Sequence, residues 1–240
     1  MEAELLAWFA EQGRELPWRR TRDPYAILVS EVMLQQTQVA RVVPRYLEWL
    51  ERWPTVDALA AASPADVIRE WQGLGYNRRA LNLHRSARRI AADGWPDDLT
   101  ELPGVGRYTA DAIALFAFGE PVLPVDTNVG RVLERTGADF GSASAHALMD
   151  LGATICLARI PRCEACPLAE CCPSRGRRYP AERRQSRFEG SFRQRRARTL
   201  RRVAMRALPA AELDPEALSS LAAEGLVQVR AGLATLPEDS

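Results

Sequence analysis

The chain of 240 residues contains no lysine, so all 32 of its basic residues are arginine. Schiff-base catalysis needs a lysine amine, so covalent chemistry that depends on a lysine side chain is excluded. No apolar run approaches the ~20 residues of a membrane span, and the amphipathic N-terminal stretch does not resemble a targeting peptide. We therefore expect a cytoplasmic protein that has no membrane partner.

Cysteine is absent outside one short stretch, where all five cysteines lie. Four of them follow the pattern Cys156-x6-Cys163-x2-Cys166-x5-Cys172. Four thiolates on one compact loop are typical of a [4Fe-4S] cluster. A zinc site stays open as an alternative, although zinc usually joins two short Cys-x2-4-Cys knuckles. A disulfide knot is disfavoured because cysteine is absent elsewhere. We expect Cys171 to be a non-ligand, although the sequence leaves an exchange with Cys172 open.

Charge is distributed unevenly along the chain, whose formal net charge is only +1. Residues 175–206 hold thirteen arginines against Glu182 and Glu189, so the rest of the chain is net acidic. A block this basic is typical of segments that neutralise nucleic-acid phosphates, but a solvated linker has the same composition. Both interpretations remain open.

Helical periodicity runs through most of the chain, with breaks at proline and glycine, and predicts an all-α fold. A small hairpin over 226–232 is the only strand signal. The expected helices span 2–12, 25–34, 37–52, 55–61, 64–72, 77–92, 107–117 and 127–135.

A glycine turn, Leu102–Gly106, lies between a short predicted helix at 97–101 and a helix that starts near Tyr108. Gly104 and Gly106 permit a tight turn, which leaves backbone N–H groups at the next helix N-terminus free to hold a phosphate. About 20 residues later, an apolar-flanked aspartate, Asp126, precedes another helix. Together these features predict a helix–hairpin–helix followed by a carboxylate.

With these motifs the chain resembles the helix–hairpin–helix DNA glycosylases, and most closely their MutY branch. The resemblance covers about 16–173 and implies a two-domain all-α fold. A six-helix barrel would span 20–124, and an iron–sulfur cluster domain would join 1–19 to 125–173. Residues 174–240 would form an arginine-rich linker and a small basic C-terminal unit, helical or winged-helix. The matching stretches are Leu16–Arg19, Asp23–Tyr25, Ser30–Val39, Gly73–Tyr76, Leu102–Ala110, Val125–Val129, Met149–Ala153 and the cysteine loop.

Two carboxylates suit the cleavage of a purine N-glycosidic bond, which needs a protonated leaving base and a stabilised sugar cation. Glu31 lies in a run nearly free of charge, where burial would make it a general acid. Asp126 precedes a helix whose dipole would keep it anionic. The resemblance implies that Glu31 protonates adenine and activates water, while Asp126 stabilises the sugar cation or attacks it. From the residues alone, an exposed helix glutamate and a plain helix cap remain open.

The resemblance also implies further site residues. Tyr108 stands where bifunctional relatives carry the Schiff-base lysine, which predicts a monofunctional glycosylase without efficient β-lyase activity. Asn128 would orient Asp126. For Leu74 and Trp18, simple core packing is the alternative. The implied DNA-contacting and base-contacting residues are Trp18, Arg19, Gln36, Thr37, Leu74, Tyr76, Gly104 and Gly106.

The chain departs from its MutY relatives in three places. Segment 136–148 is shorter and lacks a helix, which would leave a wall of the base pocket open. His146 stands four residues before Asp150, where relatives read the adenine edge with Gln or Glu; histidine can donate or accept there. The large C-terminal domain that recognises 8-oxoguanine is absent.

We expect a nucleoid-associated, monomeric base-excision-repair enzyme that binds double-stranded DNA with a mismatch or an oxidised guanine. Its predicted reaction is removal of adenine mispaired with 8-oxoguanine or guanine. Because Tyr108 does not decide which base is cut, a thymine or uracil mismatch glycosylase is one alternative. The other is a non-catalytic iron–sulfur DNA-binding protein.

Overall fold

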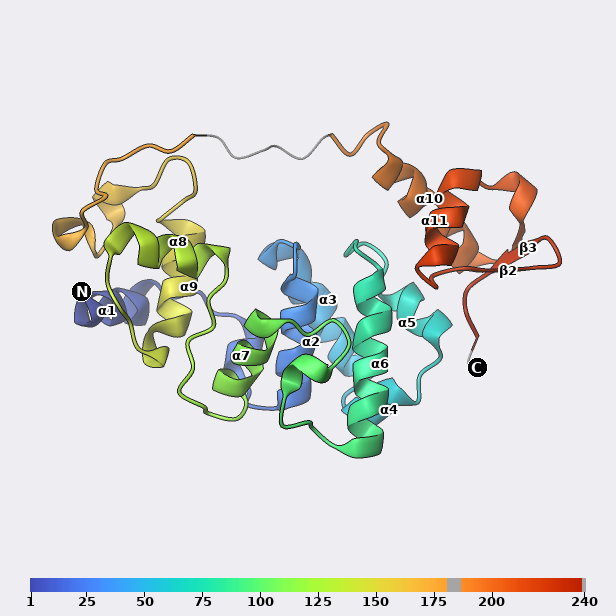
Figure 1. Cartoon of the computed structure of the whole chain (residues 1–240), viewed down its shortest axis with the longest axis horizontal. Helices are drawn as coiled ribbons and strands as arrows, with labels where there is room; N and C mark the ends of the chain where they lie inside the picture. The colour runs from blue at the N-terminus through green and yellow to red at the C-terminus, as the bar shows by residue number, and fades with distance from the viewer. Residues whose placement is uncertain (181–186, 239–240) are drawn as a thin grey trace. The chain divides into compact units, whose positions relative to one another are not determined.

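The computed structural model describes residues 1–180 and 187–238 and divides into two compact units (Figure 1). The first unit combines Met1–Ile27 with the described part of Gly106–Arg184. The second combines Leu28–Val105 with the described part of Gln185–Ser240. Within the described residues the chain passes between the units twice, inside α2 (Pro24–Leu34) and between Val105 and Gly106.

The first unit is helical. An apolar cluster joins Leu5 of α1, Val132 of α8, Leu148 of α9 and Leu168 of the cysteine loop. Burial of these side chains, at roughly 25 cal/mol per Å² of apolar surface, is the main force that holds the loop against the helices. The helices are α1 (Glu2–Gln12), α7 (Arg107–Phe116), α8 (Thr127–Thr136) and α9 (Ala145–Thr154).

The second unit begins with a helical bundle. Trp49 of α3 meets Trp53 and Trp71 edge to face, with ring centroids 4.7 and 5.4 Å apart. Such geometry adds roughly 0.5–1.5 kcal/mol to the burial of each ring pair. Thr55 and Ser63 cap the two short helices with their side-chain oxygens. The helices after α2 are α3 (Val39–Arg52), α4 (Val56–Ala60), α5 (Pro64–Glu70) and α6 (Arg78–Asp93).

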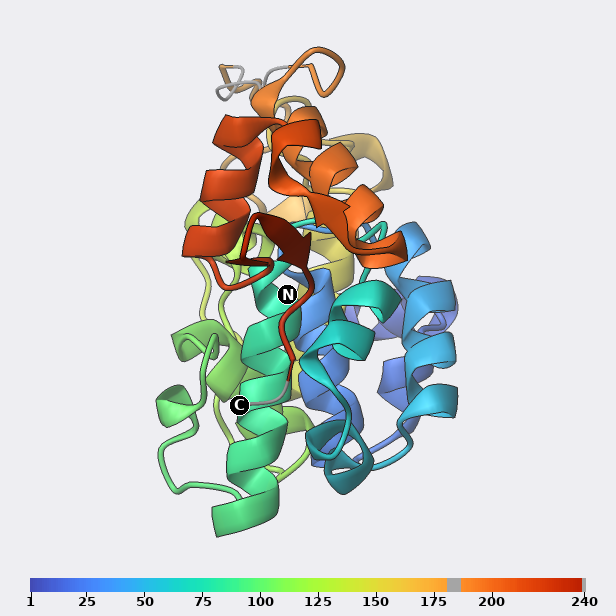
Figure 2. The same cartoon turned by 90° about the vertical axis from the view of Figure 1, so that its right-hand side faces the viewer.

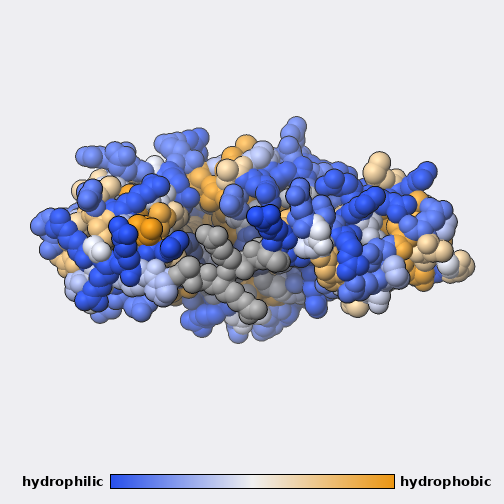
Figure 3. All heavy atoms as spheres, turned by 90° about the horizontal axis from the view of Figure 1, so that it is seen from above, coloured by the Kyte–Doolittle hydropathy of each residue, from blue (hydrophilic) through white to orange (hydrophobic). Residues whose placement is uncertain are grey.

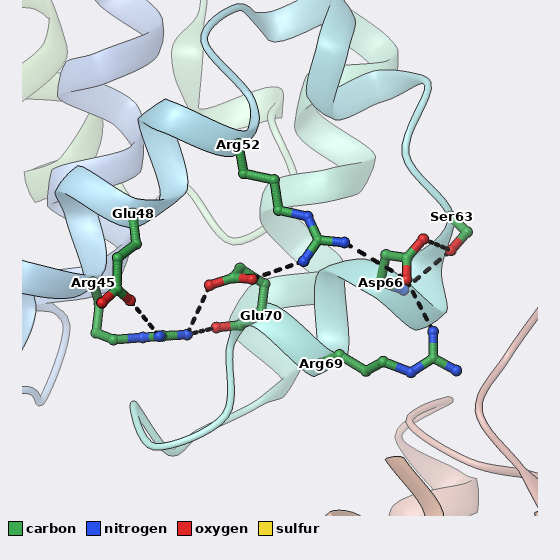
Figure 4. A network of polar contacts seen from close by, with 7 residues as sticks. All are labelled: Arg45, Glu48, Arg52, Ser63, Asp66, Arg69 and Glu70. Carbon is green, nitrogen blue, oxygen red and sulfur yellow. Dashed lines mark hydrogen bonds and ion pairs between the residues drawn. The ribbon is translucent and has the colours of Figure 1, made fainter. Parts of the chain in front are cut away.

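A polar network fastens α3 to α5 on the surface of this bundle (Figure 4). Arg52 and Arg45 both reach the Glu70 carboxylate, at 2.8 and 3.1 Å. Arg69 pairs with Asp66 at 2.9 Å and also donates Nε–H to the carbonyl of Ala204, at 3.1 Å. Each exposed pair contributes only about 0–1 kcal/mol, so the network's main effect is to orient these helices and their arginines.

The C-terminal unit, residues 187–238, folds against α5 and α6 of the bundle. Its elements are α10 (Phe192–Met205), β1 (Leu208–Pro209), α11 (Pro215–Ala223), β2 (Gln228–Arg230) and β3 (Leu233–Thr235). The strands form an antiparallel sheet in the order β1-β3-β2. Ala231 and Gly232 both have positive φ, 47° and 77°, as a two-residue hairpin turn requires. Ile68 and Leu81 of the bundle share one apolar core with this unit.

The predicted all-α class is confirmed for most of the chain, and the eight longer predicted helices occur within about two residues of their expected ends. The short helix predicted at 97–101 is a single 3-10 turn, Leu99–Glu101. The predicted small hairpin is also present, as β2 and β3. Three helices were not predicted: α9, α10 and α11. Among the described residues, no helix is long and apolar enough to cross a bilayer.

Candidate functional site

Asp126 is the N-cap of α8, as the sequence predicts. One carboxylate oxygen accepts the backbone N–H of Val129 at 2.7 Å, and the other accepts the side-chain amide of Asn128 at 3.2 Å. The two donors fix the direction of the carboxylate at the N-terminus of the helix. The bond from Asn128 is the contact expected if Asn128 orients Asp126.

A chain of hydrogen bonds continues from Asp126 to the cysteine loop. Arg131 donates Nη2–H to Asn128 Oδ1 and to the carbonyl of Gly152, each at 2.7 Å. Its Nε–H reaches the carbonyl of Cys156 at 2.8 Å. A Cβ on Gly152 would lie only 2.8 Å from Asn128 atoms, so glycine is needed for α8 and α9 to approach here. The first cysteine and the candidate catalytic aspartate are thus mechanically linked.

Glu31 lies in the second unit, on the most apolar helix of the described chain. Consecutive residues from Tyr25 to Met33 are buried, and Glu31 itself is 5% exposed. Burial penalises a charged carboxylate, and no other acidic side chain belongs to this helix. The alternative of an exposed helix glutamate is wrong.

Two neighbouring loops of the second unit carry the four residues predicted to contact the opposing base. Gln36 is exposed and has a positive φ of 57°, and Tyr76 is 52% exposed with a φ of 45°. A positive φ is strained for such side chains and marks positions that their surroundings must hold. Thr37 is half-buried. Leu74 is 3% exposed, so the structure places it in the core and not at the surface.

Arg79, which the sequence did not single out, organises both loops. Its guanidinium donates to the carbonyls of Gln35 at 2.6 Å and Gly75 at 3.0 Å, and to Thr37 Oγ1 at 3.0 Å. Burial lowers its pKa to about 10, so it stays charged at neutral pH. A signal was present, because Arg79 falls on the buried face of α6 with Leu83.

The glycine turn adopts the expected conformation at one of its two glycines. Gly104 has a φ of 80°, and a Cβ there would lie 2.8 Å from the Asn82 amide. Gly106 has a φ of −90° and caps α7, so its backbone does not require glycine. Both glycines are exposed, which leaves the backbone of the turn accessible, and Tyr108 lies half-buried in the first turn of α7.

A cavity of about 280 Å³ in the first unit brings together Trp18, Arg19 and His146. The His146 ring stacks on Phe116, with centroids 4.2 Å apart and planes at 14°. Burial, and secondarily the charge of Arg19, lowers the pKa of His146 to about 4. At neutral pH this imidazole is therefore uncharged and offers one donor and one acceptor. Trp18 is largely buried but contributes to the cavity wall.

Asp150, 1% exposed, holds Arg19 at the edge of this cavity. Both carboxylate oxygens accept from the Arg19 guanidinium, at 2.7 and 3.0 Å, and Arg14 adds its backbone N–H and Nε–H, each at 2.8 Å. Burial alone would raise the pKa of Asp150, but these hydrogen bonds outweigh it and lower the pKa. Sequence reasoning missed this ion pair, because its partners are far apart in the chain.

The short segment before His146 contributes small side chains to the cavity. Residues 137–144 join α8 to α9 with only a brief 3-10 turn at Ser142–Ser144, so no further α-helix lies between them. Ser142 and Ala143 line the cavity. Glu2 fastens the segment by accepting the Gly141 N–H at 3.1 Å and the Ser144 hydroxyl at 2.7 Å.

The four predicted metal ligands, Cys156, Cys163, Cys166 and Cys172, all line one mostly apolar cavity, while Cys171 is exposed outside it. Cys156 Sγ accepts from Arg135 at 3.4 Å, and Cys163 Sγ accepts the Gly176 N–H at 3.3 Å. Such N–H···S contacts suit sulfur that carries negative charge.

The four sulfurs are compatible with an iron–sulfur cluster, in which each thiolate binds a different iron. Among residues 1–180 and 187–238, no three His, Cys, Asp or Glu side chains converge closely enough to hold one metal ion. Burial, together with the other three cysteines, raises the pKa of Cys166, so a bound cation would be needed to keep that sulfur as a thiolate.

Comparison with known proteins decides the family. The model of the HhH-GPD superfamily of base excision DNA repair proteins matches residues 29–153. An adenine DNA glycosylase of Mycolicibacterium smegmatis is 44% identical over 269 aligned positions, which cover 94% of this chain and 92% of that protein. The chain belongs to the adenine DNA glycosylase family. The alignment has 269 positions and the chain has 240 residues, so the alignment contains gaps in this chain where the mycobacterial protein has additional residues.

Solved structures agree with the family on the fold. A thermostable thymine-DNA glycosylase matches with a TM-score of 0.64 and 28% identity, over 71% of this chain and 93% of its own. A trapped endonuclease III–DNA covalent intermediate matches with a TM-score of 0.62 and 27% identity, over 71% and 92%. More than a quarter of this adenine DNA glycosylase family member has no counterpart in either.

Proposed function

We propose that this chain is a monofunctional DNA glycosylase of base excision repair, which hydrolyses the N-glycosidic bond of adenine mispaired with 8-oxoguanine or guanine. The observation that carries the proposal is the opposite setting of two carboxylates. Asp126 is held by an amide, a helix N-terminus and Asn128, whereas Glu31 is buried on an apolar helix. One setting favours the anion and the other the acid, the pair that glycoside hydrolysis uses.

In the proposed reaction the adenine leaves the duplex and Glu31 donates its proton to the base, which makes the base a better leaving group. Asp126 stabilises the positive charge that develops on the sugar, and a water activated by Glu31 completes the hydrolysis. Extruding the base costs a few kcal/mol. Gln36 and Tyr76 are proposed to contact the duplex at the position from which the adenine is extruded, because both are exposed on loops that Arg79 holds.

The cavity beside His146 is proposed to read the purine edge. A neutral imidazole stacked on Phe116 can present a donor and an acceptor in fixed directions, and Trp18 and Arg19 complete the wall. Leu74, buried in the same loop as the exposed Tyr76, is proposed to support that loop and not to enter the duplex.

The four cysteines are proposed to hold a [4Fe-4S] cluster, whose contribution is to cross-link the loop to α8 and α9. The cavity that these cysteines line and the N–H donors to two of the sulfurs support this assignment. The chemistry is assigned to the carboxylates, because in the described part of the chain the cysteine loop is linked to Asp126 indirectly, through Arg131 and Asn128.

The proposed substrate is tested with purified protein on four duplexes that carry A opposite 8-oxoguanine, A opposite G, T opposite G, or U opposite G. Alkali then cleaves abasic sites. Cleavage at adenine in the first two duplexes is expected. Cleavage at T or U would favour the second candidate, a pyrimidine mismatch glycosylase, which the likeness to a thymine-DNA glycosylase supports. No cleavage of any duplex would favour a non-catalytic DNA-binding protein.

The monofunctional assignment has its own test. The chain has no lysine for a Schiff base, and Tyr108 occupies the first turn of α7. Borohydride added during the reaction is therefore expected to trap no protein–DNA adduct through a side chain. A trapped adduct that maps to an internal residue would contradict the assignment.

A further inference from the structure

We infer that the C-terminal unit is a second DNA-binding surface, which contacts duplex phosphates through a solvent-facing row of arginines on α10: Arg198, Arg201 and, one residue past the helix, Arg206. This set is called the α10 row below. The inference rests on the proposed function only in taking duplex DNA as the partner. The choice of base to be excised plays no part in it.

The arginines of α10 divide into two classes. Arg195 pairs with Asp214 at 2.8 Å and with Glu216 at 2.6 Å, both at the start of α11. Arg196 pairs with Glu224 at 2.8 Å, at the end of α11. Acidic residues of the neighbouring helix therefore neutralise these cations, and the pairs fasten α10 to α11. They are not available to phosphates.

The α10 row forms the other class. Its side chains are exposed and make no hydrogen bond or ion pair with any residue of the described chain. Arg198 and Arg201 are three residues apart, so they project from one face of the helix. Met205, 81% exposed, continues that face. Uncompensated arginines so close together repel one another, and phosphates would relieve that repulsion. Arg183 and Arg184 of the predicted basic block lie outside the described residues.

The topology of the unit also favours phosphate contact over base reading. A helix, a strand, a second helix and a two-stranded hairpin with sheet order β1-β3-β2 have the arrangement of a winged helix. In a groove-reading unit the second helix presents donors to base edges. Here α11 has the sequence PEALSSLAA and carries Glu216 but no basic residue. Its charge is wrong for a DNA groove. The unit's cations lie instead on α10, at Arg187 and Arg206 on either side of it, and at Arg230 of the hairpin.

The unit is held beside loops that the proposed function assigns to DNA. Leu81 of α6 lies in the apolar core shared with the C-terminal unit, and it follows Tyr76 by five residues. α6 begins at Arg78, so Leu81 lies only about 4.5 Å along the helix axis from the end of α6 that adjoins the Tyr76 loop. Arg69 adds a polar contact to Ala204, next to Met205 at the end of α10. Figures 1 and 2 show α10 and α11 beside the bundle helices α5 and α6.

The surface around the unit is hydrophilic enough to meet DNA. Seen from above, hydrophilic side chains cover most of this face of the second unit, with small apolar areas between them (Figure 3). The bundle contributes further exposed arginines on α6, Arg78, Arg85 and Arg88, for which no ion pair is present in the described chain. A basic surface that spans α6 and α10 would therefore extend the contact beyond the excised base.

The test measures binding of an undamaged duplex by fluorescence anisotropy over a range of salt concentrations, with the full-length variant Arg198→Gln/Arg201→Gln. Each phosphate contact contributes about 0.9 to the slope of log K against log salt. The double variant is therefore expected to lower that slope by about 2 and to weaken binding at low salt. Because the measurement uses no lesion, its outcome is independent of which base the protein excises.

Two matched variants make the test decisive. Arg195→Gln/Arg196→Gln removes the same charge from the same helix, but from arginines already paired with acids of the unit, and should leave the slope within about 0.5 of the parent. Arg198→Lys/Arg201→Lys keeps the charge and should keep the slope. Equal slopes for the parent and the Arg198/Arg201 glutamine variant would overturn the inference. So would equal reductions in both glutamine variants, since net charge alone would then be responsible.

Discussion

Asp126 and Glu31 show two ways in which this chain controls a carboxylate. Around Asp126 the first unit is densely hydrogen-bonded, with Asn128 and Arg131 in series behind the carboxylate. Around Glu31 the helix is apolar and buried. The same functional group thus has two different settings, hydrogen-bond donors in one unit and buried apolar side chains in the other. The following experiments test that difference.

The largest expected effect comes from removing each carboxylate's charge or proton while keeping its shape. Glu31→Gln should lower single-turnover adenine excision by about 10²–10⁴-fold, because a positioned general acid contributes that much. Asp126→Asn should lower it by about 10²–10³-fold through lost charge stabilisation, while asparagine still caps α8.

The pH profiles of the residual activities separate the two roles. The parent should lose activity as pH rises through the pKa of the acid, and Glu31→Gln should lack that alkaline decline. Asp126→Asn should retain it. Full activity of Glu31→Gln on adenine would contradict the assignment of Glu31 as the acid. Identical pH profiles for the two variants would show that Glu31 and Asp126 do not have different roles in the reaction.

The next largest effect is expected from loss of a cysteine ligand. The cysteine loop belongs to the same unit as Asp126, whereas Glu31 lies in the other unit. Cys163→Ser should lose iron and visible absorbance and should expose the first unit to limited proteolysis, because a ligand set of three leaves the loop without its cross-link. The bundle around Glu31 should resist the protease as before. Cys171→Ser is the matched control, since that side chain lies outside the cavity. A soluble, cluster-free and fully active Cys163→Ser protein would contradict the prediction.

Local sequence signals predicted the apolar surroundings of Glu31 and the helix that follows Asp126. They did not predict the long-range hydrogen bonds that hold the neighbouring site residues in place. The charge-free run around Glu31 and the apolar-flanked Asp126 before a helix are readable within about ten residues. Arg79 was missed because its acceptors belong to two other loops. The carboxylate that holds Arg19 was missed because it lies more than a hundred residues away. Such contacts depend on tertiary packing, which residue periodicity does not encode.

The C-terminal unit was only partly predictable for a related reason. Its hairpin has a clear turn signal at Ala231-Gly232. The sequence of α10, by contrast, is so rich in arginine that it is equally compatible with a solvated linker. The face of α10 that packs against the bundle contains only Leu200 and Val203 as fully buried apolar residues. The helix is stabilised by distant acids on α11. For Leu74 the error is in the opposite direction. The family resemblance implies a contact with DNA, but the fold buries this side chain.

A smaller effect is expected from cutting the path between Asp126 and the cysteine loop. Arg131→Gln removes the bonds to Asn128, Gly152 and Cys156. Removing such supporting contacts typically costs 10–100-fold in activity, so excision should slow by about that factor while iron content stays near that of the parent. Substitution of Arg41, an exposed arginine of α3, gives a charge-matched control. An unchanged excision rate in Arg131→Gln would mean that Asn128 alone positions the carboxylate.

The smallest expected effect is a pH-dependent change in stability caused by His146. Its pKa is about 4 in the folded protein, against an ordinary value near 6.5. Between these values the unfolded chain binds more protons than the folded one, so stability falls as pH drops from about 6.5 towards 4. The slope is at most about 1.4 kcal/mol per pH unit. In His146→Gln, the free energy of unfolding measured with urea should depend less on pH in this window.

The pKa of Asp150 is lowered in the folded protein, so its contribution to stability should be lost below about pH 4, as the carboxylate becomes protonated. If His146→Gln kept the full slope between pH 6.5 and 4, the imidazole would not be buried in its neutral form, and the cavity beside Arg19 would be open to water.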